Sequence, residues 1–155
     1  MQNIDTTDLQ ILALLQPDAR VSNASLAKEL GMAPSAVLER VRKLEAKGVI
    51  EDYFTRINPL SVDQKLLSFM FIRTSTPPGD TQLAEQLGNI AEIQELHIIA
   101  GEDCLLAKVR TSDAQALVTL MREKLSKIPG VVATKTTIVL QTMKEKNHIV
   151  IPKTL

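Results

Sequence analysis

The stretch SLAKELGMAPSAV, residues 25–37, decides how the first third of this chain folds. Two helices that meet at a steep angle need a small residue inside the first helix, a turn glycine between them and an apolar anchor on the second. Ala27, Gly31 and Val37 occupy these three positions. The stretch therefore predicts a helix-turn-helix, an arrangement that presents its second helix to the major groove of DNA.

Working outward, apolar spacing and helix-ending residues predict three helices before residue 50. The first covers about residues 6–15, the second carries Leu26, Ala27 and Leu30 and stops at Gly31, and the third covers 34–47. Residues 49–57 are predicted to form a short strand. Ser22 or Asn23 can cap the second helix, and Pro34 is well placed at the first position of the third. At about 14 residues and roughly 21 Å, the third helix is long enough to lie in a major groove.

Helical spacing then assigns the faces of the third helix. Val37, Val41 and Leu44 share its inward face. Residues near the start of the outward face are candidates for contact with base edges, and these are Ser35, Ala36, Leu38 and Glu39. Basic residues suit phosphates, and these are Arg40, Arg42, Lys43 and Lys47, with Lys28 and Arg20 as outlying candidates. The segment 34–47 carries four basic and two acidic residues, so its charge favours DNA only mildly, and the basic residues could simply solvate an exposed helix.

A different pattern begins after Asn58-Pro59-Leu60-Ser61, the predicted linker. Strands are predicted at about 66–74, 93–100, 104–111 and 131–140, with helices beginning near Thr81 and after Ser112 or Asp113. The order strand, helix, strand, strand, helix, strand is the ferredoxin-like arrangement. The sequence thus predicts an α+β chain with a winged or simple helix-turn-helix domain over 1–57, a linker over 58–64 and a ferredoxin-like βαββαβ domain over 65–155.

Bulk composition says little about partners. The 18 basic and 18 acidic residues cancel, so net charge offers no argument for nucleic acid. Cys104 is the only cysteine, which excludes an internal disulfide and fits a reducing compartment. The start of the chain does not have the pattern of a signal peptide, and the apolar run Leu66 to Ile72 is too short to cross a bilayer. A cytoplasmic location with no membrane partner is expected.

Many short matches in order make the chain resemble the Lrp/AsnC family of transcription factors over essentially its whole length. The matching residues of the first half are Ile4, Asp5, Asp8, Ile11, Leu12, Leu26, Ala27, Gly31, Val37, Arg40, Val41, Leu44, Glu45, Gly48, Val49 and Ile50. Those of the second half are Gly101, Leu105, Leu106, Pro129, Gly130, Val131, Thr134 and Thr136, and the tail Lys144, Asn147, Val150 and Ile151 is similar to that of the leucine-responsive subgroup.

The resemblance implies a ligand-sensing role for the second domain. Members dimerise through it, often assemble into octamers, and many bind an amino acid such as leucine or methionine near the hairpin turn; no other cofactor and no metal is implied. The effector candidates carried over are Gly101, Glu102, Asp103 and Cys104, with Thr136, Thr137 and Ile138 as weaker ones. This sequence departs from the family at Ala33, where a serine cap is common, and at Cys104, where many members carry an aspartate.

An independent argument favours assembly. The strand 66–74 is apolar on both faces, with Met70 and Ile72 on one and Phe69 and Phe71 on the other. Two helices can cover only one face of a four-stranded sheet, so the second face predicts a dimer. A dimer would present two reading helices roughly 34 Å apart, which suits a pseudo-palindromic duplex target.

Two other functions are weighed against a sensing regulator. An architectural DNA-binding protein would share this fold and lack an effector, and nothing in the sequence excludes it. An enzyme is disfavoured, since His97 and His148 lack the spacing of a metal pair, no glycine-rich phosphate loop follows a strand, and Cys104 opens an apolar strand typical of a buried thiol.

Overall fold

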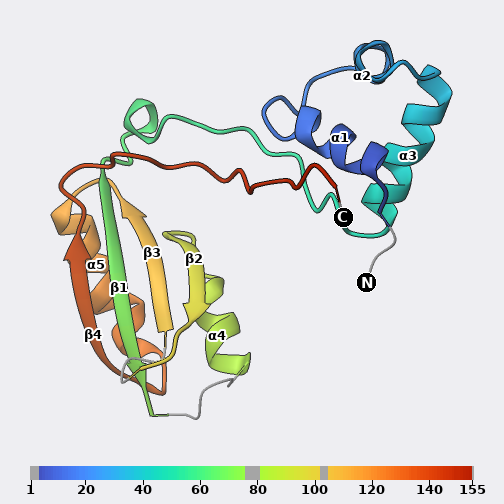
Figure 1. The fold of residues 1–155 in the computed structure, drawn as a ribbon. Helices are drawn as coiled ribbons and strands as arrows, with labels where there is room; N and C mark the ends of the chain where they lie inside the picture. The colour runs from blue at the N-terminus through green and yellow to red at the C-terminus, as the bar shows by residue number, and fades with distance from the viewer. Residues whose placement is uncertain (1–3, 76–80, 102–104, 155) are drawn as a thin grey trace. The chain divides into compact units, whose positions relative to one another are not determined.

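The computed structural model describes residues 4–75, 81–101 and 105–154. The chain divides into two compact units (Figure 1). A helical unit contains residues 1–56 together with 144–155, and a sheet unit contains residues 57–143. The second stretch of the helical unit, residues 144–154 as described, is called the tail below. By contacts it lies with the helices, whereas the sequence grouped it with the ferredoxin-like domain.

The helical unit forms α1 (Thr6–Leu15), α2 (Asn23–Leu30) and α3 (Pro34–Ala46). Ser22 caps α2 by accepting a hydrogen bond from the Ser25 amide, and Gly31 ends it with a φ of 64°, a left-handed conformation that favours glycine. Between α2 and α3 this turn lets the apolar faces of all three helices meet in one core. Its buried members are Ile11, Leu15, Leu26, Ala27, Val37, Val41 and Leu44.

Two details of this unit bear on the predictions. Ala33 is the N-cap of α3 and supplies no side-chain hydrogen bond, as its methyl group dictates. The strand predicted over residues 49–57 is wrong, because the described residues of the helical unit include no strand. A strand is stable only beside a partner strand, and a unit built from three helices offers none.

The sheet unit contains β1 (Leu66–Thr74), α4 (Thr81–Gly88), β2 (Ile93–Ile98), β3 (Leu105–Thr111), α5 (Ala114–Glu123) and β4 (Val131–Ile138), with 3-10 turns at Pro59–Val62 and Leu125–Lys127. The strand order is β2-β3-β1-β4 and every pairing is antiparallel. This confirms the predicted ferredoxin-like α+β arrangement.

The two faces of the sheet have different surroundings. Met70 and Ile72 of β1 are fully buried in a core that includes Leu87 of α4 and Leu120 of α5. Side chains alternate along a strand, so Phe69, Phe71 and their neighbours lie on the opposite face, which the helices do not cover; we call this the open face. Phe69 and Phe71 are half-buried there.

Candidate DNA interface and effector site

The outward side of α3 is the candidate reading surface. Val37, Val41 and Leu44 are buried, as predicted, so the helix phase is fixed by its core contacts. Four predicted DNA-contact residues are exposed, namely Ser35, Glu39, Arg42 and Lys43, as is Lys47 at the C-cap, while Ala36, Leu38 and Arg40 are half-buried.

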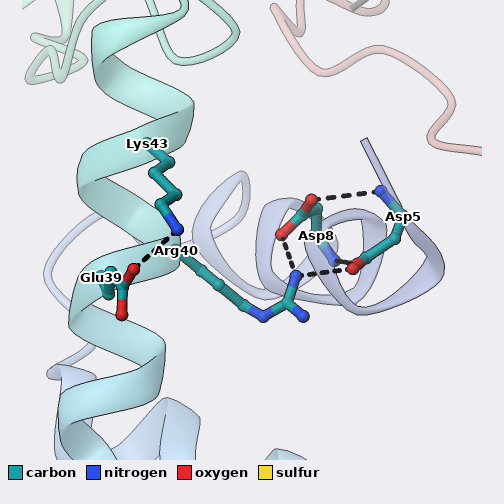
Figure 2. A network of polar contacts seen from close by, with 5 residues as sticks. All are labelled: Asp5, Asp8, Glu39, Arg40 and Lys43. Carbon is teal, nitrogen blue, oxygen red and sulfur yellow. Dashed lines mark hydrogen bonds and ion pairs between the residues drawn. The ribbon is translucent and has the colours of Figure 1, made fainter. Parts of the chain in front are cut away.

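Arg40 is engaged inside the helical unit (Figure 2). Its Nη1 donates to Asp5 Oδ2 and to Asp8 Oδ1, each at 2.7 Å. Asp5 and Asp8 also form the capping box of α1, in which each side chain accepts from the other's backbone amide. One guanidinium therefore ties the middle of α3 to the first turn of α1, and a phosphate would have to compete with two carboxylates for it.

Electrostatics in this cluster favour the charged state of each partner. Hydrogen bonds to Asp5 and then Asp8 raise the pKa of Arg40 above its usual value. The pKa of Asp5 is lowered, first by the Asp8 amide and then by Arg40. Arg40 thus positions α3 against α1 through these two carboxylates, and its contact with a phosphate stays a prediction. Sequence reasoning missed this because 35 residues separate Arg40 from Asp5, and no periodicity links them.

Glu39 and Lys43, two further predicted contacts, form an exposed ion pair one helical turn apart on α3. Lys43 Nζ lies 2.6 Å from Glu39 Oε1, and this hydrogen bond lowers the pKa of Glu39. Exposed pairs of this kind contribute little free energy, so a phosphate could draw Lys43 away at small cost.

Beside α3 lies a hollow of about 250 Å³, called the Arg42 hollow below. Arg42, Leu38 and Glu45 of α3 form one wall, and Tyr53 from the segment after α3 forms another. The Tyr53 hydroxyl donates to Glu45 Oε1 at 2.8 Å. Burial and this carboxylate raise the pKa of Tyr53 to about 12. Tyr53 was not predicted, and it braces the side of α3 that carries Arg42.

The predicted effector residues fall in two places. Gly101, in the turn between β2 and β3, is exposed and has a φ of 143°, while Glu102, Asp103 and Cys104 lie outside the described residues. Thr136 pairs with Met70 and so faces the helices, whereas Thr137 pairs with Phe69 on the open face. Ile138 pairs with Ser68 and shares the side of Thr136.

The strands next to the described members of these two groups are not neighbours in the sheet. β3, which follows the turn, is separated from β4 by β1, a distance of about 10 Å. Leu105, the first residue of β3 after the β2–β3 turn, pairs with Ile72 of β1. Thr136 of β4 pairs with Met70, which lies two residues farther along β1 from that turn.

Comparison with known proteins decides the family. Residues 4–51 match the sequence profile of a winged helix-turn-helix DNA-binding domain, and residues 68–149 match that of the Lrp/AsnC ligand binding domain. This chain belongs to the Lrp/AsnC family. It is a DNA-binding transcriptional regulator that carries a ligand-binding domain.

Relatives of this Lrp/AsnC regulator cover nearly all of it. The leucine-responsive regulatory protein of Escherichia coli (strain K12) is 38% identical over 152 residues, which are 97% of this chain and 93% of the relative. The feast or famine regulatory protein of M. tuberculosis, solved in complex with L-methionine, has a TM-score of 0.88 and 32% identity, covering 97% of this chain and 100% of that one. The E. coli AsnC structure has a TM-score of 0.86 and 26% identity, covering 97% and 99%.

These relatives are named as regulators, which agrees with the expectation that this Lrp/AsnC chain is not an enzyme. The described residues hold no group of three or more His, Cys, Asp and Glu side chains that could bind a metal ion. A search of the same residues found no helix with the length and apolar character needed to span a membrane. His97 is exposed, with Nε2 3.5 Å from Glu95 Oε2, and Cys104 falls outside the described part.

A second hollow, of about 330 Å³, lies along α5. Asp113 and Glu123 line it, together with Glu92 and Lys124, which pair at 2.6 Å. Of the predicted effector residues that the structure describes, namely Gly101, Thr136, Thr137 and Ile138, none lines this hollow. The hollow along α5 therefore does not support the effector site predicted from the β2–β3 turn and β4.

Proposed function

We propose that this regulator binds duplex DNA with the outward side of α3, and that an amino acid such as leucine or methionine controls its DNA binding or assembly. The observation that carries the proposal is the orientation of α3. Burial of Val37, Val41 and Leu44 turns Ser35, Glu39 and Arg42 outward, where base edges and phosphates can be reached. A cytoplasmic location follows from this role and remains part of the proposal.

Arg42→Ala tests the DNA interface. Removing a phosphate-binding side chain should weaken binding at low salt and make the slope of log affinity against log salt shallower by about 0.9. Fluorescence anisotropy with a labelled duplex measures both quantities. Arg122→Ala, an exposed arginine on α5 of the sheet unit, is the matched control and should leave the slope unchanged. An unchanged slope for Arg42→Ala would remove this residue from the interface.

The effector proposal rests on the turn between β2 and β3. A ligand that prefers the folded protein raises its apparent melting temperature, so a thermal-shift panel of free amino acids should identify one that does. Gly101→Asp should abolish this shift and leave DNA affinity within about twofold, because it adds a negative charge at a φ that L residues rarely adopt.

Gly88→Asp provides the control for adding a carboxylate at an unhindered glycine of the same unit. If Gly101→Asp abolishes DNA binding as well, the turn is structural and not an effector site. A panel in which no amino acid shifts the melting temperature would favour the architectural DNA-binding protein.

We also propose that the open face joins two copies of the chain, which gives the dimer and a route to larger rings. Leu67, Phe69 and Phe71 of β1 lie there with Leu106 of β3. Burying such a face against a second copy contributes roughly 25 cal/mol for each Å² of apolar area. A two-fold dimer would set the two α3 helices against successive major grooves.

A further inference from the structure

The tail is anchored to the helical unit by a pair of hydrogen bonds. The side-chain amide of Gln16, at the end of α1, donates from Nε2 to the carbonyl oxygen of Ile149 at 2.9 Å. In return, the Ile149 amide donates to Gln16 Oε1, also at 2.9 Å. Farther along, Arg56 Nη2 lies 3.7 Å from Glu145 Oε2. Because Gln16 satisfies both backbone groups of one residue, it fixes the position of the tail as a neighbouring strand would.

The anchored tail changes the net charge of the helical unit. Residues 1–56 carry seven basic and eight acidic side chains, a net charge of −1 for the part of the chain that contains all three helices. Two of the seven are already engaged within this segment, since Arg40 binds Asp5 and Asp8, and Lys43 pairs with Glu39. For a surface that must approach a polyanion, this is a poor balance.

The tail reverses that balance. Residues 144–155 hold three lysines and one glutamate, so the whole helical unit becomes net positive only when they are included. Lys144, Lys146 and Lys153 are exposed, and within the described part of the chain none of the three has an ion-pair partner. Glu145 is half-buried between the first two and is directed to Arg56.

We propose that the tail is a second DNA-contacting element, held on the helical unit by Gln16 so that Lys144, Lys146 and Lys153 bind phosphates of the duplex read by α3. This inference rests on the proposed function, since it adds contacts to the same DNA. The placement suits it, because Leu15, which precedes Gln16, lines the same hollow as Arg42. The residue that anchors the tail is thus the direct neighbour in sequence of a residue that lines the Arg42 hollow.

The triple variant Lys144→Ala, Lys146→Ala, Lys153→Ala tests the proposal on a duplex of random sequence, because phosphate binding does not depend on sequence. We expect affinity at low salt to fall about tenfold or more. The salt slope should become shallower by about 0.9 for each phosphate that the variant no longer binds. The matched control is Lys65→Ala, Lys124→Ala, Lys127→Ala, which removes the same charge from the sheet unit and should change neither quantity.

Gln16→Ala separates position from charge. It keeps every lysine but removes both hydrogen bonds to Ile149, so we expect an intermediate reduction of affinity. Gln10→Ala, on the exposed side of the same helix, is its control and should bind normally. Circular dichroism should show unchanged helix content in all four variants.

Three outcomes would overturn the inference. One is a lysine triple variant that keeps the affinity and slope of the unaltered protein. Another is an equal reduction in the control triple, which would mean that total charge matters and not the tail. The last is weaker binding accompanied by a smaller oligomer in size-exclusion chromatography, which would assign the tail to contacts between protein copies. If the unaltered protein binds DNA and Arg42→Ala weakens it while the tail variants do not, only this inference fails and the proposed function stands.

Discussion

The helical unit and the sheet unit solve the problem of covering apolar surface in different ways. Three short helices enclose one core on all sides and close it with a polar lock, in which Arg40 of α3 binds Asp5 and Asp8 of α1. The sheet has apolar residues on both faces and helices on only one. The difference fits the two proposals made above, in which the helical unit meets a polar partner, DNA, and a second copy of the chain covers the open face of the sheet unit.

The largest effect is expected when a glutamate is placed on either face of β1 in two separate variants, which tests whether the two faces differ. Met70→Glu buries a charge at a fully buried position, so the sheet unit should lose more than about 4 kcal/mol of stability and unfold. Phe71→Glu places the same charge on the half-buried open face. It should leave the secondary structure intact and yield monomers.

Circular dichroism and size-exclusion chromatography distinguish the two variants. The sequence showed both faces of this strand to be apolar, and the structure decides which of them tests the dimer. Only Phe71 tests it, because Met70 lies in the core shared with the helices. Intact oligomers of folded Phe71→Glu would show that the open face is not the interface.

A smaller effect on stability is expected when the ion pairs of Arg40 with Asp5 and Asp8 are removed. Arg40→Ala leaves the largely buried Asp8 carboxylate without its cation, and we expect a decrease of about 1 to 2 kcal/mol in the free energy of unfolding. Lys43→Ala, which removes an exposed pair, should lower the free energy of unfolding clearly less than Arg40→Ala does. Urea unfolding of the two variants provides the comparison, and equal decreases would contradict the distinction.

The pH dependence of the lock has a defined sign. The pKa of Asp5 is lower in the folded state than its ordinary value of 3.8. Its contribution to stability is therefore fully present above that value and is lost as pH falls through the lowered pKa. Acid unfolding of the unaltered protein should show this decline below about pH 4, and Arg40→Ala should show less of it.

The smallest effect concerns the start of α3. Ala33→Ser should supply the missing side-chain cap and stabilise the helical unit by about 0.5 to 1 kcal/mol. A thermal melt would show a modest increase in melting temperature. Ala36→Ser, inside the first turn of the same helix, controls for the added hydroxyl and should not stabilise.

Local patterns predicted much of the fold. Apolar spacing located all three helices of the helical unit, and alternation separated Met70 from Phe71 on β1. These features depend on neighbours within a few residues, which a sequence shows directly. The prediction of a strand after α3 was wrong because a strand needs a second strand to pair with, and no local pattern in the sequence shows that this second strand is missing.

The candidate sites were less predictable for the same reason. Arg40 was assigned to DNA from its place on α3, but its partners are Asp5 and Asp8, more than 30 residues away. Gln16 and Ile149 are 133 residues apart and meet through a side chain and a backbone, a pairing without a sequence signature. Thr136, Thr137 and Ile138 are adjacent in sequence, yet the pleat of β4 sends Thr137 to the opposite face.

The bond between Gln16 and Ile149 also orders events during synthesis. Residue 149 leaves the ribosomal exit tunnel only after the entire sheet unit has done so, and the helices therefore exist for a time without the tail. If the tail supplies DNA contacts, a chain synthesised only as far as the sheet unit would bind DNA more weakly than one that includes the tail. The tail would then strengthen DNA binding only once the sheet unit, which precedes it in the chain, has been made.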